Sequence, residues 1–299
     1  MSRHWLGQSE RGSKFMLRLI TWIALRLGRA PARALLYPIC GYFIVFSRHA
    51  RRASRQYLER VLGRAVGIME VCRHYHCFAA TILDRVFLLG GRHEIFDIDA
   101  HGADVILQRV KKGEGCILLG SHLGSFEVLR TLGIAMAHLP IKILMYEENA
   151  QKVSEIIASL NPALSNSVIP IGTPDSMLRV KECLDQGELV GILGDRVAQD
   201  DKIVRCSFLG QPTHFPAGPM LLAAALGVPV ILCFGLYRGG NRYEIYTELL
   251  ADRIKISRTD RSGDLQRWTQ RYVDRLEHYC RSAPYNWFNF YDYWAMAKR

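Results

Sequence analysis

The sequence lacks the cysteine spacings of a disulfide framework or a metal site. It contains eight cysteines, and none belongs to a Cys-x-x-Cys pair. Several, such as Cys116 and Cys233, lie in apolar runs, which is typical of free thiols in a reducing compartment. In the segment 72–77, Cys72 and His76 would share one helical face. No second pair of ligands matches them, so we expect no metal and no redox cofactor.

The chain also lacks an internal repeat, a low-complexity tract and a clean signal peptide. Residues 15–27 are largely apolar but include Arg18 and Arg26, and no small-residue cleavage site follows. The longest uncharged run of the N-terminal segment is 34–47, which has 14 residues. A straight helix needs about 20 apolar residues to cross a bilayer. We therefore expect this segment to lie on a membrane surface, while a span over 15–46 stays open because arginines can reach the interface.

Acidic residues are scarce at the start of the chain. Residues 1–64 contain 13 Lys and Arg against 2 Asp and Glu, a balance of +11, which equals the net charge of the whole protein. The other 235 residues contain 26 of each sign. A nucleic-acid protein more often spreads its basic residues over a folded face, whereas a basic apolar arm suits an anionic membrane surface. We expect no nucleic-acid partner.

The basic excess predicts a two-part chain, with a membrane-associating helical arm over 1–64 and a catalytic domain over 65–299. On a helix, five basic residues of the arm project over one broad sector: Lys14, Arg18, Arg26, Arg29 and Arg33. Their charged ends would then lie among lipid phosphates. The alternative is a helix that packs on the core and has a solvated basic edge.

From residue 95 onward, short apolar runs alternate with helical patterns. Candidate strands are 95–99, 116–120, 141–146, 168–171, 189–193, 228–234 and 243–249. Candidate helices are 49–63, 67–90, 101–112, 125–138, 149–161, 174–187, 217–226 and 264–282. Such alternation is typical of an α/β fold with a mixed, largely parallel central sheet flanked by helices.

The chemistry of an open α/β sheet gathers at the carboxyl ends of its strands. The first candidate junction is the segment 115–130, where an apolar strand ends at Gly120 and a glycine-flanked turn presents His122. Glu127 follows in the first turn of the next helix. A carboxylate on one imidazole nitrogen raises the basicity of the other nitrogen. We therefore predict that Glu127 orients His122, which removes a proton from an acceptor hydroxyl as it attacks an acyl thioester.

A second junction is the strand end at Gly194, which is followed by Asp195 and Arg196. An arginine just past a strand end can contact phosphate or carboxylate through two hydrogen bonds. Asp195 would orient Arg196 or neutralise it. We expect Gly194, Asp195, Arg196 and Ser121 to bind substrate. The alternative is a buried Asp195–Arg196 pair that ties the loop down.

Four blocks of sequence carry a resemblance to a known family. They are the His-x4-Glu block at 122–127, the Gly-Asp-Arg block at 194–196, and the segments 208–219 and 227–230. Over about residues 10–295 the chain resembles the bacterial lysophospholipid acyltransferase superfamily, and within it the lipid A biosynthesis (lauroyl or myristoyl) acyltransferases. The resemblance implies an α/β fold and an N-terminal membrane-associating helix. It makes His122 the base, Glu127 the orienting acid, and Arg196 the contact for acceptor phosphate or developing charge.

Two segments depart from the lipid A pattern. A basic block is usual after the strand that follows the histidine helix, but Glu147 and Glu148 stand there in this chain. Asp292 lies in an aromatic run near the C-terminus, where a basic cluster is usual. Both changes remove positive charge that a bisphosphorylated acceptor would need. The chain is similar to a branch found beside aryl-polyene or fatty-acid-like biosynthesis genes, so we expect an aryl-polyene lipid or another lyso-lipid as acceptor.

The resemblance implies an acyl carrier protein or acyl-CoA as donor and a lipid-like acceptor at the cytoplasmic face of the inner membrane. We therefore predict a membrane-associated acyltransferase that also contacts anionic lipids. Two alternatives stay open: a thioesterase or lipid hydrolase with water or Ser121 as nucleophile, and a non-catalytic partner in a lipid biosynthetic complex. The Gly-x-Ser-x-Gly elbow of hydrolases is missing at Ser121, which counts against the first alternative.

Overall fold

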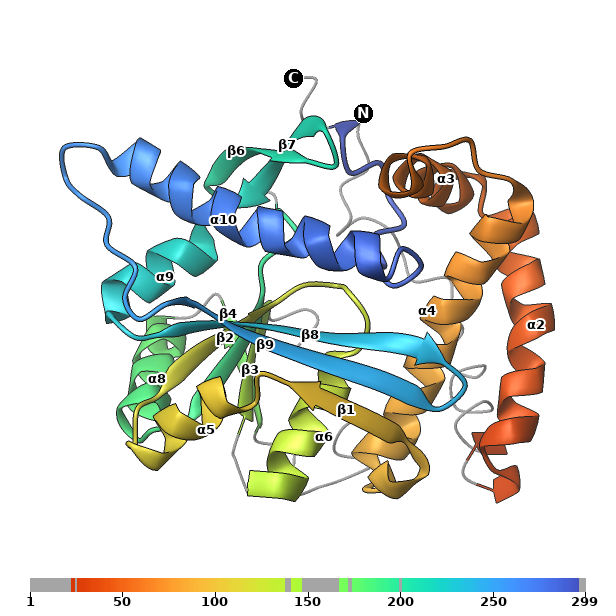
Figure 1. Cartoon of the computed structure of the whole chain (residues 1–299), viewed down its shortest axis with the longest axis horizontal. Coiled ribbons are helices and arrows are strands. Elements are labelled where there is room, and N and C mark those ends of the chain that lie inside the picture. The colour runs from red at the N-terminus through yellow and green to blue at the C-terminus, as the bar shows by residue number, and fades with distance from the viewer. Residues whose placement is uncertain are drawn as a thin grey trace.

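The central element of the computed structural model is a seven-stranded sheet in the order β1–β9–β8–β2–β5–β3–β4 (Figure 1). The structure describes residues 23–24, 26–137, 141–146, 167–171, 174–198 and 201–295. The strands of the sheet are β1 (Asp97–His101), β2 (Cys116–Gly120), β3 (Ile141–Tyr146), β4 (Val168–Ile171), β5 (Leu189–Leu193), β8 (Val230–Gly239) and β9 (Arg242–Ala251). All neighbouring strands are parallel except β8 and β9. The predicted mixed, largely parallel sheet is confirmed.

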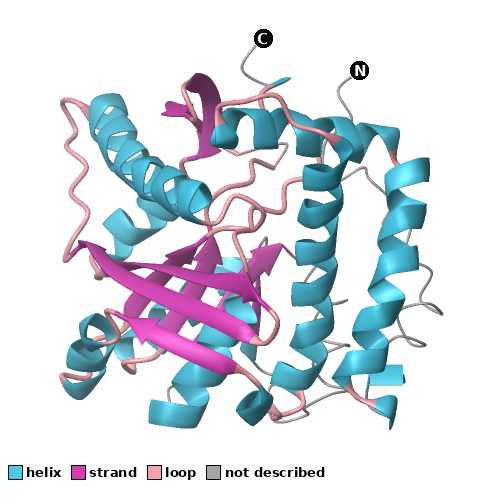
Figure 2. Cartoon of the chain, turned by 45° about the vertical axis from the view of Figure 1, so that its right-hand side comes forward, coloured by secondary structure: helices cyan, strands magenta, loops and turns pink. Residues whose placement is uncertain are grey.

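Helices cover both faces of the sheet and one of its ends. They are α2 (Arg29–Phe46), α3 (Arg48–Leu62), α4 (Ile68–Leu89), α5 (Asp104–Lys111), α6 (Phe126–Ala137), α8 (Pro174–Asp185), α9 (Gly218–Leu226) and α10 (Arg261–Ser282). α9, α10 and a separate hairpin of β6 (Ile203–Phe208) and β7 (Gln211–Pro216) lie on one face, with α5 and α6 on the other (Figure 1). α2 and α4 run side by side at the end toward which β8 points (Figure 2).

The sheet separates two hydrophobic clusters of buried side chains. One contains residues of β2, β5, β8, α9 and α10, and the other contains residues of β2, β8, α5 and α6. Helix α4 contributes to both clusters, with Tyr75 in the first and Leu83 in the second. Cys40 of α2 and Tyr57 of α3 also lie in the first cluster. From α2 onward, the residues before position 64 therefore pack into the same body as the sheet.

The apolar runs predict most of these elements closely. β2, β3, β4 and β5 begin and end at the predicted residues, because strands buried on both faces read as continuous apolar runs. The predicted helix over 149–161 lies outside the described residues. The hairpin of β6 and β7 was not predicted, because β7 contains two prolines, which are uncommon within strands.

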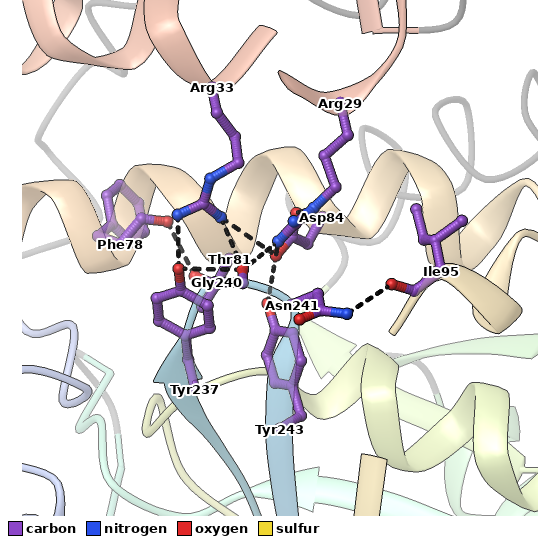
Figure 3. A network of polar contacts seen from close by, with 10 residues as sticks. All are labelled: Arg29, Arg33, Phe78, Thr81, Asp84, Ile95, Tyr237, Gly240, Asn241 and Tyr243. Carbon is purple, nitrogen blue, oxygen red and sulfur yellow. Dashed lines mark hydrogen bonds and ion pairs between the residues drawn. The ribbon is translucent and has the colours of Figure 1, made fainter. Parts of the chain in front are cut away.

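Two arginines of α2 turn inward and meet a buried carboxylate of α4 (Figure 3). The Nε of Arg29 donates to Asp84 at 2.7 Å, and the hydroxyl of Tyr243 donates to the same carboxylate at 2.8 Å. Arg33 donates to the hydroxyl of Tyr237 at 2.6 Å. The side chain of Asp84 is fully buried, so its charge requires such partners.

This network corrects the expected arrangement of the basic sector. Arg29 and Arg33 bind Asp84 and the turn between β8 and β9, so their guanidinium groups do not point toward lipid. A buried carboxylate attracts a nearby cation more strongly than solvated phosphates do, because the dielectric constant around it is low. Lys14 and Arg18 lie outside the described residues.

Helix α2 is apolar on its outer side as well as on its buried side. Its buried residues are Ala32, Leu36, Cys40 and Ile44. On its outer side, Tyr42, Val45 and Phe46 are 58%, 61% and 62% exposed. Among the described helices, none is by itself long and apolar enough to cross a bilayer, although α2 and α3 together, bent by 99°, reach that length and composition.

Candidate active site

His122 lies in the turn between β2 and α6, at the carboxyl end of the sheet. The N–H of Gly124 donates to the carbonyl of Asn286, and the N–H of Ser125 donates to that of Gly235, each at 2.8 Å. Gly124 has a φ of +70°, and a Cβ atom at this position would lie 1.9 Å from the carbonyl oxygen of Gly235. Only glycine fits there, so this residue fixes the turn that presents His122.

The imidazole of His122 binds the carboxylate of Asp195, which follows β5. Nδ1 lies 2.7 Å from Oδ1, and the main-chain N–H of His122 donates to both carboxylate oxygens at 3.1 Å. β2 and β5 are parallel neighbours, so the loops after them emerge side by side. A carboxylate only accepts hydrogen bonds, so Nδ1 carries the proton and Nε2 keeps its lone pair.

The two side chains of this pair differ in exposure. That of Asp195 is fully buried, whereas that of His122 is 27% exposed. Because the Nδ1 edge of the ring faces the buried carboxylate, the accessible part of the ring includes Nε2. One nitrogen is thus oriented and the other is open to a substrate, which is the geometry of a general base.

The C-terminal segment supplies the other partners of Asp195. The indole N–H of Trp287 donates to Oδ2 at 3.0 Å, and the amide of Asn289 donates to the same oxygen at 2.8 Å. The hydroxyl of Tyr293 donates to the main-chain carbonyl of Asp195 at 2.7 Å. A buried carboxylate is stable only when its oxygens are satisfied in this way, so these residues hold Asp195 in its ionised form and in place.

The charges of the site set the protonation state of the pair. Burial by itself would raise the pKa of Asp195, but the charge and hydrogen bond of His122, with Arg196 and Asn289, lower it below its usual value. Burial, assisted by the charge of Arg196, lowers the pKa of His122 below its ordinary 6.5, and Asp195 offsets this only in part. At neutral pH, Asp195 is therefore ionised and His122 is unprotonated.

Glu127, which we expected to contact His122, has another close partner. Its Oε2 lies 2.8 Å from NH2 of Arg130, and NH1 of Arg130 donates to Ser167 at 2.9 Å. The carboxylate on Nδ1 of His122 is that of Asp195, which corrects the expected contact. Two positions five residues apart across a helix start do not align, whereas the loops after neighbouring strands do. A catalytic role for Glu127 stays a prediction.

The other predicted site residues lie around the same turn. Arg196 donates through Nε to Asn289 at 2.7 Å and through NH2 to the carbonyl of Phe288 at 3.0 Å. The N–H of Gly194 donates to Gly120 at 3.0 Å, which joins the ends of β5 and β2. Ser121 is buried, and its Oγ lies near the hydroxyl of Tyr272 without a hydrogen bond of good geometry. Their roles in substrate binding stay predictions.

A buried histidine of α4 extends this network and was not found from the sequence. Nε2 of His74 lies 2.9 Å from the carbonyl of Trp287, and Nδ1 lies 2.8 Å from Oγ of Ser54 in α3. Burial lowers the pKa of His74 to about 4, so this imidazole is neutral. Hydrogen bonds therefore connect α3, through α4 and Trp287, to Asp195. In the sequence, His74 lies in the segment 72–77, whose cysteine and histidine positions suggest metal ligands only, and nothing there indicates a contact with Trp287.

An oriented histidine at the carboxyl ends of parallel strands is an arrangement that transferases and hydrolases use. Comparison with protein families makes the class specific: the chain belongs to the bacterial lipid A biosynthesis acyltransferase family, whose model matches residues 11–295. No curated protein matches the chain. The family supports acyl transfer to a lipid-like acceptor, which agrees with the resemblance carried by the four blocks.

Replacing Asp195 by asparagine tests how His122 is oriented. We expect kcat to fall by roughly 10³–10⁴-fold, because an amide does not fix the tautomer that leaves Nε2 free. The wild-type rate should rise with pH through a pKa below 6.5 and be level at neutral pH, since the unprotonated imidazole is the active form. This rise is the acidic limb of the pH–rate profile. Because the carboxylate of Asp195 raises the pKa of His122, replacing Asp195 should move the acidic limb to lower pH. The measurement is the pH dependence of kcat.

Asp185→Asn is the matched control, because it makes the same chemical change at an exposed carboxylate near the end of α8, away from the turn that contains His122. It should leave both kcat and the acidic limb unchanged. A full rate in Asp195→Asn, or an acidic limb displaced to higher pH, would contradict the orientation of His122 by Asp195.

Proposed function

We propose that the protein is a membrane-associated acyltransferase that moves a fatty acyl group from a thioester to a hydroxyl of a lipid-like acceptor. The observation that carries the proposal is the hydrogen bond of 2.7 Å between Nδ1 of His122 and buried Asp195, with the Nε2 edge of the ring accessible. The family supports the reaction class, and the donor and the mechanism are part of the proposal.

The proposed reaction uses His122 first as a base and then as an acid. Nε2 takes the proton of the acceptor hydroxyl while the hydroxyl oxygen attacks the carbonyl carbon of the thioester. The carbon–sulfur bond then breaks, and the leaving thiolate takes the proton back from the imidazolium. The products are an ester and a free thiol, and His122 returns to its neutral form. The ionised Asp195 stabilises the transient imidazolium without accepting its proton.

Glu127 takes an indirect role in this proposal. Its ion pair with the buried guanidinium of Arg130 holds the first turn of α6, and Arg130 also binds Ser167 beside β4. Because α6 begins four residues after His122, this pair would set the direction in which the catalytic turn enters the helix. Glu127 is then a positioning residue that acts through the backbone.

The donor proposed here is an acyl carrier protein or acyl-CoA, and the acceptor is an aryl-polyene lipid or another lyso-lipid. Both donors are made in the cytoplasm, and all eight cysteines are free thiols, as expected in a reducing compartment. We therefore place the enzyme at the cytoplasmic face of the inner membrane. The reaction as proposed requires no resident cofactor.

The surface proposed to contact the membrane is the corner between α2 and α3, formed by Tyr42, Val45 and Phe46 of α2 and by Arg48, Arg52 and Arg55 of α3. The three apolar side chains are mostly exposed, and the three arginines are also exposed. The arginines are spaced by four and three residues, so they share one face of α3. An apolar edge beside a basic face fits an anionic lipid surface.

Hydrolysis is a weaker candidate for the same site. A serine nucleophile would have to be Ser121, but this residue is only 7% exposed and its side chain lies near Tyr272. Water could still replace the acceptor at His122. Loss of thioester in the absence of any acceptor would support that reaction.

A comparison of His122→Ala with Glu127→Gln tests the assigned roles. His122→Ala should lower the rate of transfer by roughly 10³–10⁴-fold. The circular dichroism spectrum and melting temperature should stay close to those of the wild type, because the main-chain N–H of residue 122, Trp287 and Asn289 still donate to Asp195. Glu127→Gln should lower both the melting temperature and kcat, because it leaves Arg130 buried without its partner. It should not displace the acidic limb of the pH–rate profile. Full transfer by His122→Ala would overturn the mechanism, and a displaced limb in Glu127→Gln would return the orienting role to Glu127.

Substitutions at the corner between α2 and α3 test the membrane contact. The double change Val45→Ser and Phe46→Ser should weaken binding to vesicles of phosphatidylethanolamine and phosphatidylglycerol by about tenfold or more, since burial of each such side chain contributes roughly 1.5–3 kcal/mol. Co-sedimentation of the protein with these vesicles measures the binding. Leu178→Ser is the control, because Leu178 of α8 is similarly exposed, at 58%, but lies elsewhere. Equal binding of the double variant and the wild type would refute this surface.

A further inference from the structure

Trp287 contacts both parts of the proposed base, the carboxylate and the turn that presents the imidazole. The residue is fully buried, and its indole N–H donates to Oδ2 of Asp195 at 3.0 Å. Its main chain forms an antiparallel bridge with Leu123, the residue after His122. A shift of Trp287 would therefore disturb the carboxylate and the catalytic turn together.

His74 of α4 holds Trp287 at its carbonyl group. Nε2 of His74 lies 2.9 Å from the carbonyl oxygen of Trp287, and Nδ1 lies 2.8 Å from Oγ of Ser54. A carbonyl only accepts hydrogen bonds, so Nε2 carries the proton and Nδ1 accepts from the hydroxyl. Because burial lowers the pKa of His74 to about 4, this imidazole anchors Trp287 without adding a charge at neutral pH.

The indole ring of Trp287 is packed among aromatic rings from three parts of the chain. Its centroid lies 4.9 Å from that of Tyr57 in α3, 5.2 Å from that of Phe208 in β6 and 4.7 Å from that of Tyr293. In a closely packed interior, the indole cannot turn without displacing these rings. Its N–H therefore stays directed at Asp195.

The two oxygens of the Asp195 carboxylate have different partners. Oδ2 accepts from the indole of Trp287 and from the amide of Asn289, whereas Oδ1 lies 2.7 Å from Nδ1 of His122. The donors on Oδ2 keep the carboxylate from rotating, so Oδ1 stays on the imidazole. An indole N–H can donate but not accept, so it favours the ionised form of the carboxylate.

We propose that Trp287 is a positioning residue of the acyl transfer, held at its carbonyl by His74 and keeping Asp195 turned toward His122 with its indole N–H. This inference rests on the proposed function. When Nε2 takes the proton of the acceptor, Asp195 must stay ionised so that the proton remains on the imidazole and can pass to the leaving thiolate. A donor fixed on Oδ2 supports that state throughout the reaction.

Other titratable side chains interact electrostatically with His122 or Asp195. They are Arg85 of α4, Arg196 after β5, Tyr272 and Cys280 of α10, and Tyr291 and Tyr293 of the C-terminal segment. The two arginines lower the pKa of His122, and burial raises the pKa of the other four groups, which are therefore neutral at neutral pH. A substitution at Trp287 removes none of these groups, so a changed titration of His122 would report on the hydrogen bond to Asp195.

Trp287→Phe removes the indole N–H and keeps an aromatic ring in the packed cluster. Without this donor the carboxylate of Asp195 is more basic and attracts the imidazolium of His122 more strongly. We expect the pKa of His122 to rise by roughly half a unit or more, as followed by NMR with the signal assigned through His122→Ala, and kcat to fall by about fivefold or more. The acidic limb should move to higher pH, opposite to the displacement expected of Asp195→Asn.

Trp294→Phe is the matched control, because it makes the same change at an indole of the same aromatic cluster. Its buried N–H has no hydrogen-bond partner among the described residues, and its ring lies 6.2 Å from that of Trp287. It should leave kcat and the pKa of His122 unchanged. An unmoved or lowered pKa of His122 in Trp287→Phe, or an equal rise in Trp294→Phe, would overturn the role of the indole.

Two amide substitutions test the anchor at His74. In His74→Gln the amide reaches about as far as Nε2 and can still donate to the carbonyl of Trp287, whereas in His74→Asn it reaches only about as far as Nδ1. His74→Gln should keep kcat and the pKa of His122 close to their wild-type values, and His74→Asn should change both as Trp287→Phe does. Equal pKa values of His122 in the two variants would remove His74 from this arrangement.

The NMR titration needs no substrate, so it separates this inference from the proposed function. Full transfer by His122→Ala would refute the base, and the titration would still show whether Trp287 acts on Asp195. An unmoved titration in Trp287→Phe, with transfer abolished by His122→Ala, would refute the positioning role and leave the base in place.

Discussion

A fully buried carboxylate, that of Asp195, is the constraint on which the rest of the site depends. An ionised group without water is stable only if its oxygens are saturated by donors and offset by positive charge. Here the donors come from two distant parts of the chain: His122 in the turn after β2, and Trp287 and Asn289 in the C-terminal segment. The need to satisfy Asp195 thus brings the end of the chain back to the carboxyl edge of the sheet and leaves Nε2 of His122 accessible.

The requirement that buried polar groups have hydrogen-bond partners also connects the site to the N-terminal helices. His74 joins the carbonyl of Trp287 to Ser54 of α3, and Asp84, also on α4, holds Arg29 of α2. Two buried polar groups of one helix therefore hold both helices that form the proposed membrane-contacting corner. The proposed membrane-contacting corner and the carboxylate of Asp195 are connected through packed and hydrogen-bonded side chains, so the proposed membrane contact and the proposed base depend on the same helices.

The local patterns of the sequence contained much of the fold and part of the site. β2 and β5 are predicted because buried parallel strands are continuous apolar runs. His122 and Asp195 are each predicted because they follow such runs. Their contact is not, since it depends on β2 and β5 being neighbours across 73 residues, and sheet order is not a local property. The nearer carboxylate, Glu127, therefore looked like the partner of His122.

The tautomer of His122 tests the central claim most directly. Long-range proton–nitrogen correlation NMR of protein labelled with ¹⁵N at histidine, recorded at neutral pH, distinguishes a protonated Nδ1 from a protonated Nε2. If buried Asp195 orients the base, His122 carries its proton on Nδ1 and has an unprotonated Nε2, and Asp195→Asn loses this preference. A proton on Nε2 at neutral pH, or an imidazolium with both nitrogens protonated, would contradict the account.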